Sequence, residues 1–314
     1  MRAPNALFAP LPKRNTLLRH LSQNRWMYLF LLPGFLYLIL FQYVPMYGVL
    51  IAFKKFTITK GFLNSPWVGL ENFRTLFRSA QFMNVLRNSI VISLLNLAWG
   101  FPAPILMALL LNEVRQSAVK RTVQTIVYLP HFVSWVVIAG MVVNILSPAG
   151  GLVNEAIKAL GGSPINFIID TRYFRSVLIS SSIWKECGWG TIIYLAAMSG
   201  IDPALYEAAI VDGASRGQQV RYITLPCILS TIIVVLILRM GSILSNGFEQ
   251  IYLLYSPTVY DVADVFETFT YRVGLLEGRF SYSTAVGLFQ SVVGFIMIFS
   301  TNRFARALGE TGLW

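Results

Sequence analysis

Six apolar runs, each long enough to cross a lipid bilayer, constrain the fold of this chain more than any other feature. Apolar residues make up 55% of the chain and charged residues only 12%, which excludes an ordinary soluble domain. Within a bilayer the backbone must satisfy its own hydrogen bonds, and a run of about 20 apolar residues does so as a helix. The sequence therefore predicts an all-α integral membrane protein with spans at Trp26–Phe53, Ser89–Leu111, Val123–Leu146, Phe174–Met198, Cys227–Phe248 and Ala285–Thr301.

Both ends of the chain are predicted to lie in the cytoplasm. Residues 1–25 carry basic side chains and no acidic one, and basic flanks stay on the cytoplasmic side of a membrane. We expect either a short amphipathic helix on the membrane surface or a disordered tail there. Six spans return residues 303–314 to the cytoplasm, so the membrane domain is residues 26–302. Two prolines in the first span predict that it crosses to about Val44 and continues as an interfacial extension.

A soluble-looking insert between the fourth and fifth spans is predicted to form two short helices. Asp202 is suited to cap the first helix and Pro203 to its first turn. Gly213 can take the left-handed conformation that ends this helix. A second short helix is expected from Ser215 onward, and Pro226 is expected to open the fifth span.

The first of these helices has one small, smooth face, because Leu205, Ala208, Ala209 and Asp212 fall at helical spacing. Such a face can lie deep in a groove of another protein, and Glu207 can find a basic partner there. The insert is therefore predicted to be a docking element. An ordinary loop between two spans is the alternative.

This insert resembles the signature of permease subunits of bacterial ABC importers, in which Glu-Ala-Ala is followed by a glycine and then by Ile-x-Leu-Pro. Asp212-Gly213-Ala214 is the variant typical of carbohydrate importers, although Val220 stands where that branch usually has phenylalanine. The resemblance implies that residues 202–226 form a cytoplasmic coupling-helix region that enters a cleft of an ATPase subunit. The match rests on Glu207, Ala208, Ala209, Gly213, Ile223, Leu225 and Pro226, and the implied coupling residues are Glu207, Ala208, Ala209, Asp212 and Gly213.

The resemblance covers most of the chain, from about Trp26 to Thr301. Further segments are similar to permeases for polysaccharides and complex oligosaccharides, and closest to those of bacterial alginate importers. These segments are Leu31–Gly34, Tyr43–Gly48, Trp67–Phe73, Tyr271–Leu275 and Ser283–Leu288.

The resemblance implies a six-helix type I ABC importer permease core in the bacterial inner (cytoplasmic) membrane. A second permease subunit, in a heterodimer, would complete the pathway for an oligosaccharide or polysaccharide. Two ATPase subunits would bind ATP and Mg, and an extracytoplasmic solute-binding protein would deliver the substrate. The chain itself has no phosphate-binding Gly-x-x-x-x-Gly-Lys-Ser/Thr loop and no catalytic triad, so we expect a non-catalytic subunit without cofactors. Its net charge of +11 fits a lipid surface and requires no nucleic acid.

Two cations are predicted near the middle of spans, Lys185 in the fourth and Arg239 in the fifth. A charge at that depth costs at least roughly 2.5–3.5 kcal/mol, so such residues usually face a water-filled cavity or a partner. Arg239, Ser242, Asn246 and Glu249 fall on one side of the expected fifth helix and form a polar stripe. The hydrogen-bond donors and acceptors of the stripe are suited to bind sugar hydroxyls, and its cation is suited to bind a carboxylated sugar. Lys185 and the four residues of the stripe are the candidates for the substrate pathway.

Three other readings of these residues stay open. The cations can be neutralised internally, with Glu186 as the acidic partner of Arg239. The chain can be a secondary transporter driven by an ion gradient, but such a protein needs acidic residues in its spans, and only Glu186 is convincing. Broken helices in matched halves are not evident either. A non-transporting membrane scaffold is the third reading, and the polar stripe argues against it.

The cysteines and histidines do not indicate a metal site or a disulfide. Cys187 and Cys227 lie in or at the ends of spans and are expected to be buried thiols. His20 and His131 are far apart and have no metal-ligand spacing. No metal is therefore expected.

Overall fold

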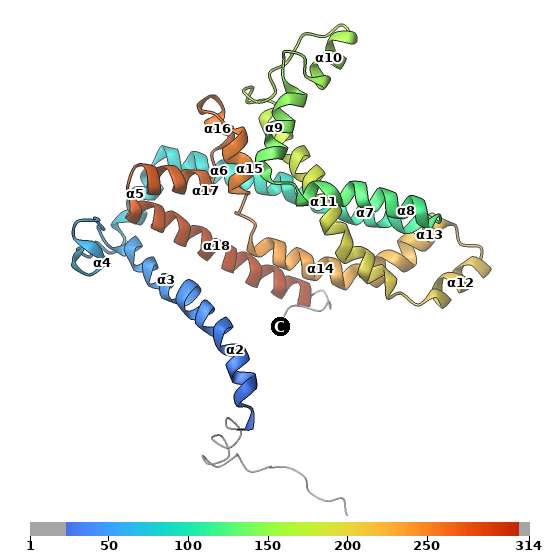
Figure 1. Ribbon diagram of the computed structural model, residues 1–314, viewed down its shortest axis with the longest axis horizontal. Coiled ribbons are helices and arrows are strands. Elements are labelled where there is room, and N and C mark those ends of the chain that lie inside the picture. Colours follow the sequence, from blue (N-terminus) through green and yellow to red (C-terminus); the bar gives the residue numbers. More distant parts are fainter. Residues whose placement is uncertain (1–22, 308–314) are drawn as a thin grey trace, which may run out of the picture. The chain divides into compact units, whose positions relative to one another are not determined.

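The computed structural model describes residues 23–307, which are almost entirely helical (Figure 1). Over this range the one β contact is an isolated antiparallel bridge between Lys54 and Trp67. The all-α class predicted from the sequence is confirmed. The expected surface helix or tail in residues 1–22 and the end of the C-terminal tail, residues 308–314, lie outside the described residues.

The chain forms two compact units, Met1–Leu50 and Ile51–Trp314. The described part of the first unit is a helical rod of α2 (Arg25–Leu38), the π turn η1 (Ile39–Tyr43) and α3 (Val44–Met46), leading into the 3-10 helix η2 (Tyr47–Phe53). Neither Pro33 nor Pro45 breaks this rod. The π turn ends at Tyr43, two residues before Pro45, whose missing N–H leaves a carbonyl of that turn without its usual partner.

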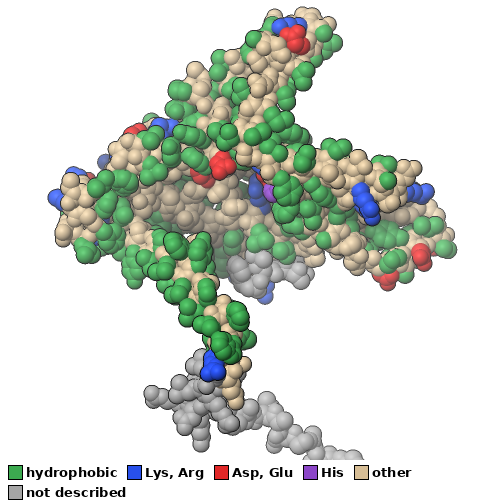
Figure 2. Space-filling view, in the orientation of Figure 1, with side chains coloured by type: hydrophobic (Ala, Val, Ile, Leu, Met, Phe, Trp, Pro, Cys, Tyr) green, Lys and Arg blue, Asp and Glu red, His purple; other side chains and the backbone are tan. Residues whose placement is uncertain are grey.

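The second unit contains the remaining spans, joined by short helices. Hydrophobic side chains cover much of the visible surface of both units (Figure 2). The long helical runs are α6–η3–α7 (Ala80–Leu95, Asn96–Gly100, Pro102–Glu113), α11 (Phe174–Ser199), α13–η5–α14 (Arg216–Gln219, Val220–Thr224, Leu225–Gly241) and α18 (Phe280–Ala307). The short helices are α4 (Gly61–Asn64), α5 (Glu71–Arg78), α10 (Leu152–Ala159), α12 (Pro203–Val211), α15 (Phe248–Leu254), η6 (Pro257–Val259), α16 (Tyr260–Ala263), α17 (Phe266–Thr270) and η7 (Tyr271–Leu276).

Four helices in the described range are long and apolar enough to cross a membrane, and a bent pair would make a fifth. The four are Arg25–Phe53, Ala80–Glu113, Arg216–Gly241 and Phe280–Ala307. The 26-residue α11 is also long enough, but it carries Arg175, Lys185 and Glu186. The count of six spans therefore stays a prediction.

The third expected span is not one helix. It consists of α8 (Ser117–Tyr128), the 3-10 helix η4 (Leu129–Phe132) and α9 (Trp135–Leu146), bent by 105°. Val133 and Ser134 have extended backbones at the bend. The prediction of an uninterrupted Val123–Leu146 helix was wrong, because hydropathy continues through a point at which the backbone turns.

The fifth expected span was misplaced at both ends. The second short helix runs without interruption from Arg216 into α14, so Pro226 lies inside a continuous helix of 26 residues and does not open it. The helix ends at Gly241 rather than at Phe248. A non-helical segment follows, and Gly247 adopts a left-handed conformation with φ +82° before α15 begins.

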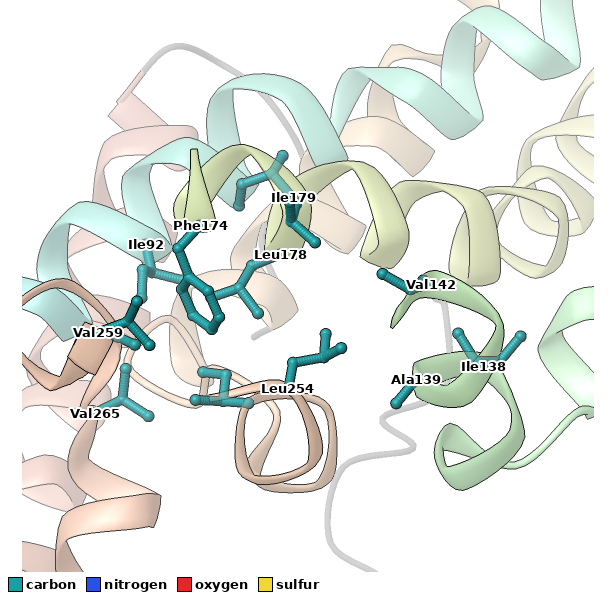
Figure 3. Close-up of a cluster of buried hydrophobic side chains, with 13 residues drawn as sticks. Ile92, Ile138, Ala139, Val142, Phe174, Leu178, Ile179, Leu254, Val259 and Val265 are labelled. Carbon is teal, nitrogen blue, oxygen red and sulfur yellow. The ribbon is translucent and has the colours of Figure 1, made fainter. Parts of the chain in front are cut away.

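The helix α11 is the central element of the second unit, since it contacts α7, α8, η4, α14 and α15. One buried cluster joins it to α6, α9 and α15 through Phe174, Leu178, Ile92 and Leu254 (Figure 3). Close packing with α8 requires Gly188, because a Cβ there would overlap the Val127 carbonyl oxygen. The residues of α11 are therefore placed precisely relative to the bend between η4 and α9.

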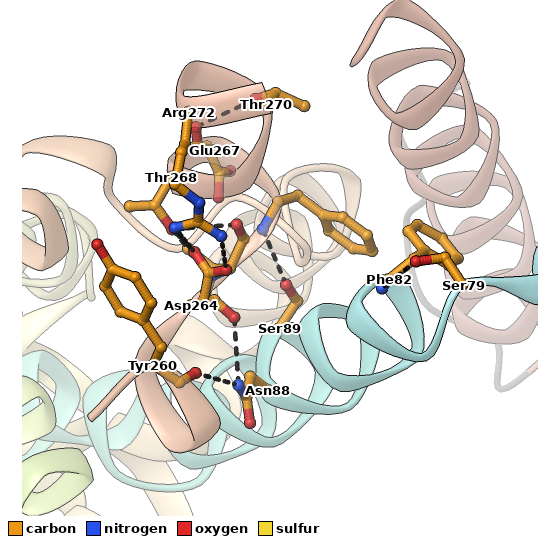
Figure 4. Close-up of polar contacts among 12 residues, drawn as sticks. Ser79, Phe82, Asn88, Ser89, Tyr260, Asp264, Glu267, Thr268, Thr270 and Arg272 are labelled. Carbon is orange, nitrogen blue, oxygen red and sulfur yellow. Dashed lines mark hydrogen bonds and ion pairs between the residues drawn. The ribbon is translucent and has the colours of Figure 1, made fainter. Parts of the chain in front are cut away.

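A buried polar network fixes the segment after α15 against α6 (Figure 4). Asp264 is 3% exposed and forms an ion pair with Arg272. Asn88 on α6 donates hydrogen bonds to the carbonyl oxygens of Tyr260 (3.3 Å) and Asp264 (3.2 Å). Glu267 in the same segment accepts from Gln290 on α18 at 2.9 Å, and burial raises the pKa of its carboxyl. The segment is therefore held in one conformation.

Candidate functional site

Lys185 holds the bend in the broken span. The residue is 5% exposed, and its ammonium donates to the carbonyl oxygens of His131 (2.7 Å), Val133 (2.9 Å) and Pro130 (3.4 Å). A helix ends with carbonyl groups that lack partners, and a cation there also meets the negative end of the helix dipole. The prediction placed Lys185 in the substrate pathway, but the structure directs its charge into the bend.

The residues after Lys185 complete the support of the bend. The Glu186 carboxylate lies 2.8 Å from His131 Nδ1 and 3.8 Å from the Lys185 ammonium. The imidazole of His131 stacks on the indole of Trp189, with ring centroids 4.6 Å apart and planes 4° apart. His131 is thus a packing and hydrogen-bonding residue.

A cavity of about 530 Å³ lies beside this cluster. Its wall from α11 includes Ser182, Glu186, Trp189 and Ile193, which follow helical spacing along one face. Its other residues come mainly from η3, α7, α9, α14, the non-helical segment before α15, and α15 itself. They include Asn96, Pro104, Trp135, Val235, Arg239, Ser242, Ser245, Asn246, Gly247 and Gln250.

Three of the four residues of the polar stripe predicted on the fifth helix line the cavity, but they do not lie along one face of a helix. Because α14 ends at Gly241, the stripe is not helical beyond Arg239, yet Arg239, Ser242 and Asn246 all line the cavity. Glu249, the second residue of α15, is not part of the cavity lining. Asn246 is 6% exposed and hydrogen-bonds with Ser93 Oγ at 3.0 Å, so it also anchors the segment to α6.

Arg239 is the exposed cation of this cavity. The pair with Glu186, which was the alternative interpretation, is not formed, since that carboxylate faces His131 and Lys185. Among the ion pairs of residues 23–307, none involves Arg239. A guanidinium on the wall of a polar cavity is suited to bind an anionic group through paired hydrogen bonds.

Sequence reasoning missed the aromatic and amide groups of the cavity. Trp189 is 47% exposed and lines it beside Trp135, and Gln250 lines it from α15. The spacing of Ser182, Glu186 and Trp189 along α11 was a signal that pointed to a common face. Gln250 carried no such signal, because the sequence did not predict α15.

The insert after α11 has the local structure that its residues predicted. The Asp202 carboxylate accepts from the Ala204 N–H at 2.9 Å, Pro203 begins α12, and Gly213 has φ +77°. Ser215 caps α13 through a capping box. No residue of α12 is buried, and Val211 is 86% exposed. The structure thus presents a short helix with uncovered apolar side chains.

The two cysteines differ in their exposure. Cys187 is buried as expected, but Cys227 is exposed, which corrects the expectation for that residue. The part of the chain that the structure describes contains no group of three or more His, Cys, Asp or Glu that could hold a metal ion.

Comparison with known proteins decides the family. Residues 100–310, which include the insert and every cavity residue except Asn96, match the family described as "Binding-protein-dependent transport system inner membrane component". The chain belongs to this permease family. It is therefore a membrane component of an ABC transporter, and the reading as an ion-driven secondary transporter is not favoured.

The permease has two similar relatives in Bacillus subtilis (strain 168). The "Polygalacturonan/rhamnogalacturonan transport system permease protein YteP" is 48% identical over 312 residues, covering 99% of this chain and 97% of that protein. "Protein LplB" is 48% identical over 294 residues, covering 94% and 92%.

Solved structures extend the similarity to the fold. A permease chain in the "crystal structure of a bacterial ABC transporter involved in the import of the acidic polysaccharide alginate" has a TM-score of 0.87 and 45% identity, covering 93% of this chain and 99% of that one. A chain of the "bacterial alginate ABC transporter in complex with alginate pentasaccharide-bound periplasmic protein" has a TM-score of 0.87 and 44% identity, covering 95% and 99%. The type I importer permease fold predicted from the sequence is confirmed.

Proposed function

We propose that this permease forms half of the translocation pathway of an ATP-driven importer for oligosaccharides or polysaccharides, with a preference for acidic ones. Arg239 carries the proposed preference, because it lines the cavity and has no carboxylate partner in the described range. In a partly wet, low-dielectric cavity a carboxylate gains more from such a charge than it does in bulk water. The relatives named for polygalacturonan and for alginate support an acidic substrate.

The proposed assembly contains a second, different permease subunit, two ATPase subunits and an extracytoplasmic solute-binding protein. The solved relative in complex with a periplasmic protein supports the last of these partners. ATP and Mg belong to the ATPase subunits, and this chain contributes no catalytic residue. The primary test is the ATPase activity of the purified assembly with its binding protein, against matched neutral and acidic oligosaccharides. If neither the neutral nor the acidic oligosaccharides stimulated the ATPase activity, the proposal would be contradicted.

The α12 segment is proposed to couple the permease to its ATPase. Leu205, on the same face as Ala208 and Ala209, is 47% exposed, so this face presents apolar area that a groove would cover. Glu207, Ala208, Ala209, Asp212 and Gly213 stay the predicted contact residues. Close approach to a groove is favoured by Ala208 and Ala209, whose side chains are small.

Arg239→Gln tests the charge preference. Glutamine keeps a hydrogen-bond donor but removes the charge, and a hydrogen bond to a charged group contributes about 1.5–3 kcal/mol. We expect import of an acidic oligosaccharide to fall by about tenfold or more while a neutral one is little affected. Import into proteoliposomes measures both.

Arg279→Gln is the matched control, because Arg279 is exposed and does not line the cavity. It should leave both substrates unchanged. An equal loss of acidic and neutral substrates in Arg239→Gln, or loss of assembly alone, would show that Arg239 is a structural residue.

The proposed topology, with both termini and α12 in the cytoplasm, can be tested by labelling single cysteines. The continuous helix Arg216–Gly241 separates α12 from α15 and α16 and is roughly 40 Å long at 1.5 Å per residue (Figure 1). In a background without Cys227, which is exposed, Gly213→Cys should react from the cytoplasm and Asp261→Cys from outside. Labelling of both from the same side would contradict the six-span topology.

A further inference from the structure

The helix α12 is joined to its neighbours in the chain by two non-helical connections. Residues 200–202 link it to α11, and residues 212–215 link it to α13. Gly213, in the second connection, has a left-handed backbone. No residue of α12 is buried. The backbone alone therefore gives α12 no rigid attachment to the helices that line the cavity.

A side-chain hydrogen bond braces α12 against the long helix that follows it. The Tyr206 hydroxyl lies 2.9 Å from Thr224 Oγ1, and Thr224 is 1% exposed. Thr224 Oγ1 itself donates to the Gln219 carbonyl oxygen at 3.5 Å, so the Tyr206 hydroxyl is the donor between the two side chains. Within residues 23–307 this is the one side-chain hydrogen bond from α12 to another helix.

Thr224 belongs to a helix that reaches the cavity. It is the last residue of the π turn η5, which lies inside the continuous helix Arg216–Gly241. A π turn within a longer helix is frequently found at a functional site. Arg239, on the same helix, lines the cavity and lies roughly 22 Å from Thr224 at 1.5 Å per residue. A displacement at Thr224 is therefore passed along one helix to the cavity wall.

The wall that α11 contributes to the cavity is held separately. Lys185 ties α11 to the bend, and Gly190 packs closely on α7, where a Cβ would lie 3.0 Å from Pro104 Cγ. In the described range no ion pair and no side-chain hydrogen bond joins α12 to α11. The side-chain link from α12 thus leads to α14 and not to α11.

We propose that the hydrogen bond between Tyr206 and Thr224 transmits a displacement of α12 to α14, and so moves the Arg239 wall of the cavity relative to the α11 wall. This inference rests on the proposed coupling of α12 to an ATPase subunit. Tyr206 and Thr224 are positioning residues, since they act through α14 and contact neither the ATPase nor the sugar. Without the bond the ATPase still docks, but its movement reaches the cavity less completely.

Tyr206→Phe and Thr224→Val test the link, because each keeps the shape of the side chain and removes one hydroxyl. ATP hydrolysis and sugar import are measured together, using the complete assembly in proteoliposomes with its binding protein. The number of ATP molecules hydrolysed per sugar imported should rise about threefold to tenfold in each variant, the range expected for the loss of one hydrogen bond. The ATPase subunits should co-purify in normal amounts.

Two further variants separate the link from a structural role. The double variant should be no worse than either single one, because both substitutions remove the same bond. Thr224→Ser, which keeps the hydroxyl, should retain the normal ratio of ATP to sugar. Thr125→Val is the matched control, because Thr125 Oγ1 donates to the Arg121 carbonyl oxygen at 2.9 Å within its own helix and joins no second one.

Three results would overturn the proposal. The first is a normal ratio of ATP to sugar in both single variants, and the second is an additive effect in the double variant. The third is loss of the ATPase subunit from purified Tyr206→Phe, since Tyr206 would then be a contact with that subunit. If the unsubstituted assembly neither hydrolysed ATP nor imported sugar, the proposed function itself would be refuted instead.

Discussion

Ala209→Trp is expected to abolish transport while the permease still inserts into the membrane. The residue is half-buried on the small face of α12, the face proposed to enter a groove of the ATPase subunit. Adding volume to a closely packed contact costs about 1–3 kcal/mol, and each 1.4 kcal/mol is a factor of ten in binding. Co-purification of the ATPase subunit with the permease should fall by about tenfold or more, and import should fall with it.

The control for this substitution places the same bulk on another face of α12. Val211 is 86% exposed and lies two residues further on, so Val211→Trp points away from the small face. It should leave association with the ATPase close to normal. Normal assembly and import in Ala209→Trp would show that the small face of α12 does not enter a tight groove.

Lys185→Met is expected to destabilise the permease strongly and without regard to substrate charge. Methionine has a similar length but cannot donate hydrogen bonds, so the carbonyl groups of Pro130, His131 and Val133 lose their shared donor. A buried group left without a partner costs about 1–3 kcal/mol. The melting temperature of the purified protein should fall by several degrees, and import of acidic and neutral substrates should fall together.

An exposed lysine provides the comparison. Lys158 on α10 is 41% exposed and paired with Glu155 at 2.8 Å, so Lys158→Met should change the melting temperature very little. Suppose that the Lys185→Met variant had a normal melting temperature and lost import of acidic substrates only. Lys185 would then be a substrate contact, as the sequence alone suggested, and not the support of the bend.

The local structure of α12 could be predicted from the sequence in detail. Asp202, Pro203 and Gly213 act on groups within a few residues of themselves, through a cap, a fixed φ and a left-handed turn. Such interactions depend little on the rest of the fold. The same holds for the apolar runs, because a backbone in lipid has few alternatives to a helix.

The breaks in the spans could not be predicted in this way. Apolar composition continues through Val133 and through Ile243, so hydropathy predicted helix at both places. The first break is stabilised by Lys185, more than 50 residues away along the chain. Asn246, in the second break, is hydrogen-bonded to Ser93 on α6. Residues distant in sequence supply the hydrogen bonds that a helix would have made for itself.

The sequence by itself determined the all-α membrane class, the permease family and the position and form of α12, because apolar run length and local capping act over short stretches of chain. Only the tertiary structure decided which polar residues share the cavity. It assigned Lys185 to the bend and left Arg239 exposed on the cavity wall, although both are cations near the middle of predicted spans. The physical reason is that a buried charge goes to the nearest group that can satisfy it, and that group is identified only once the helices are packed together.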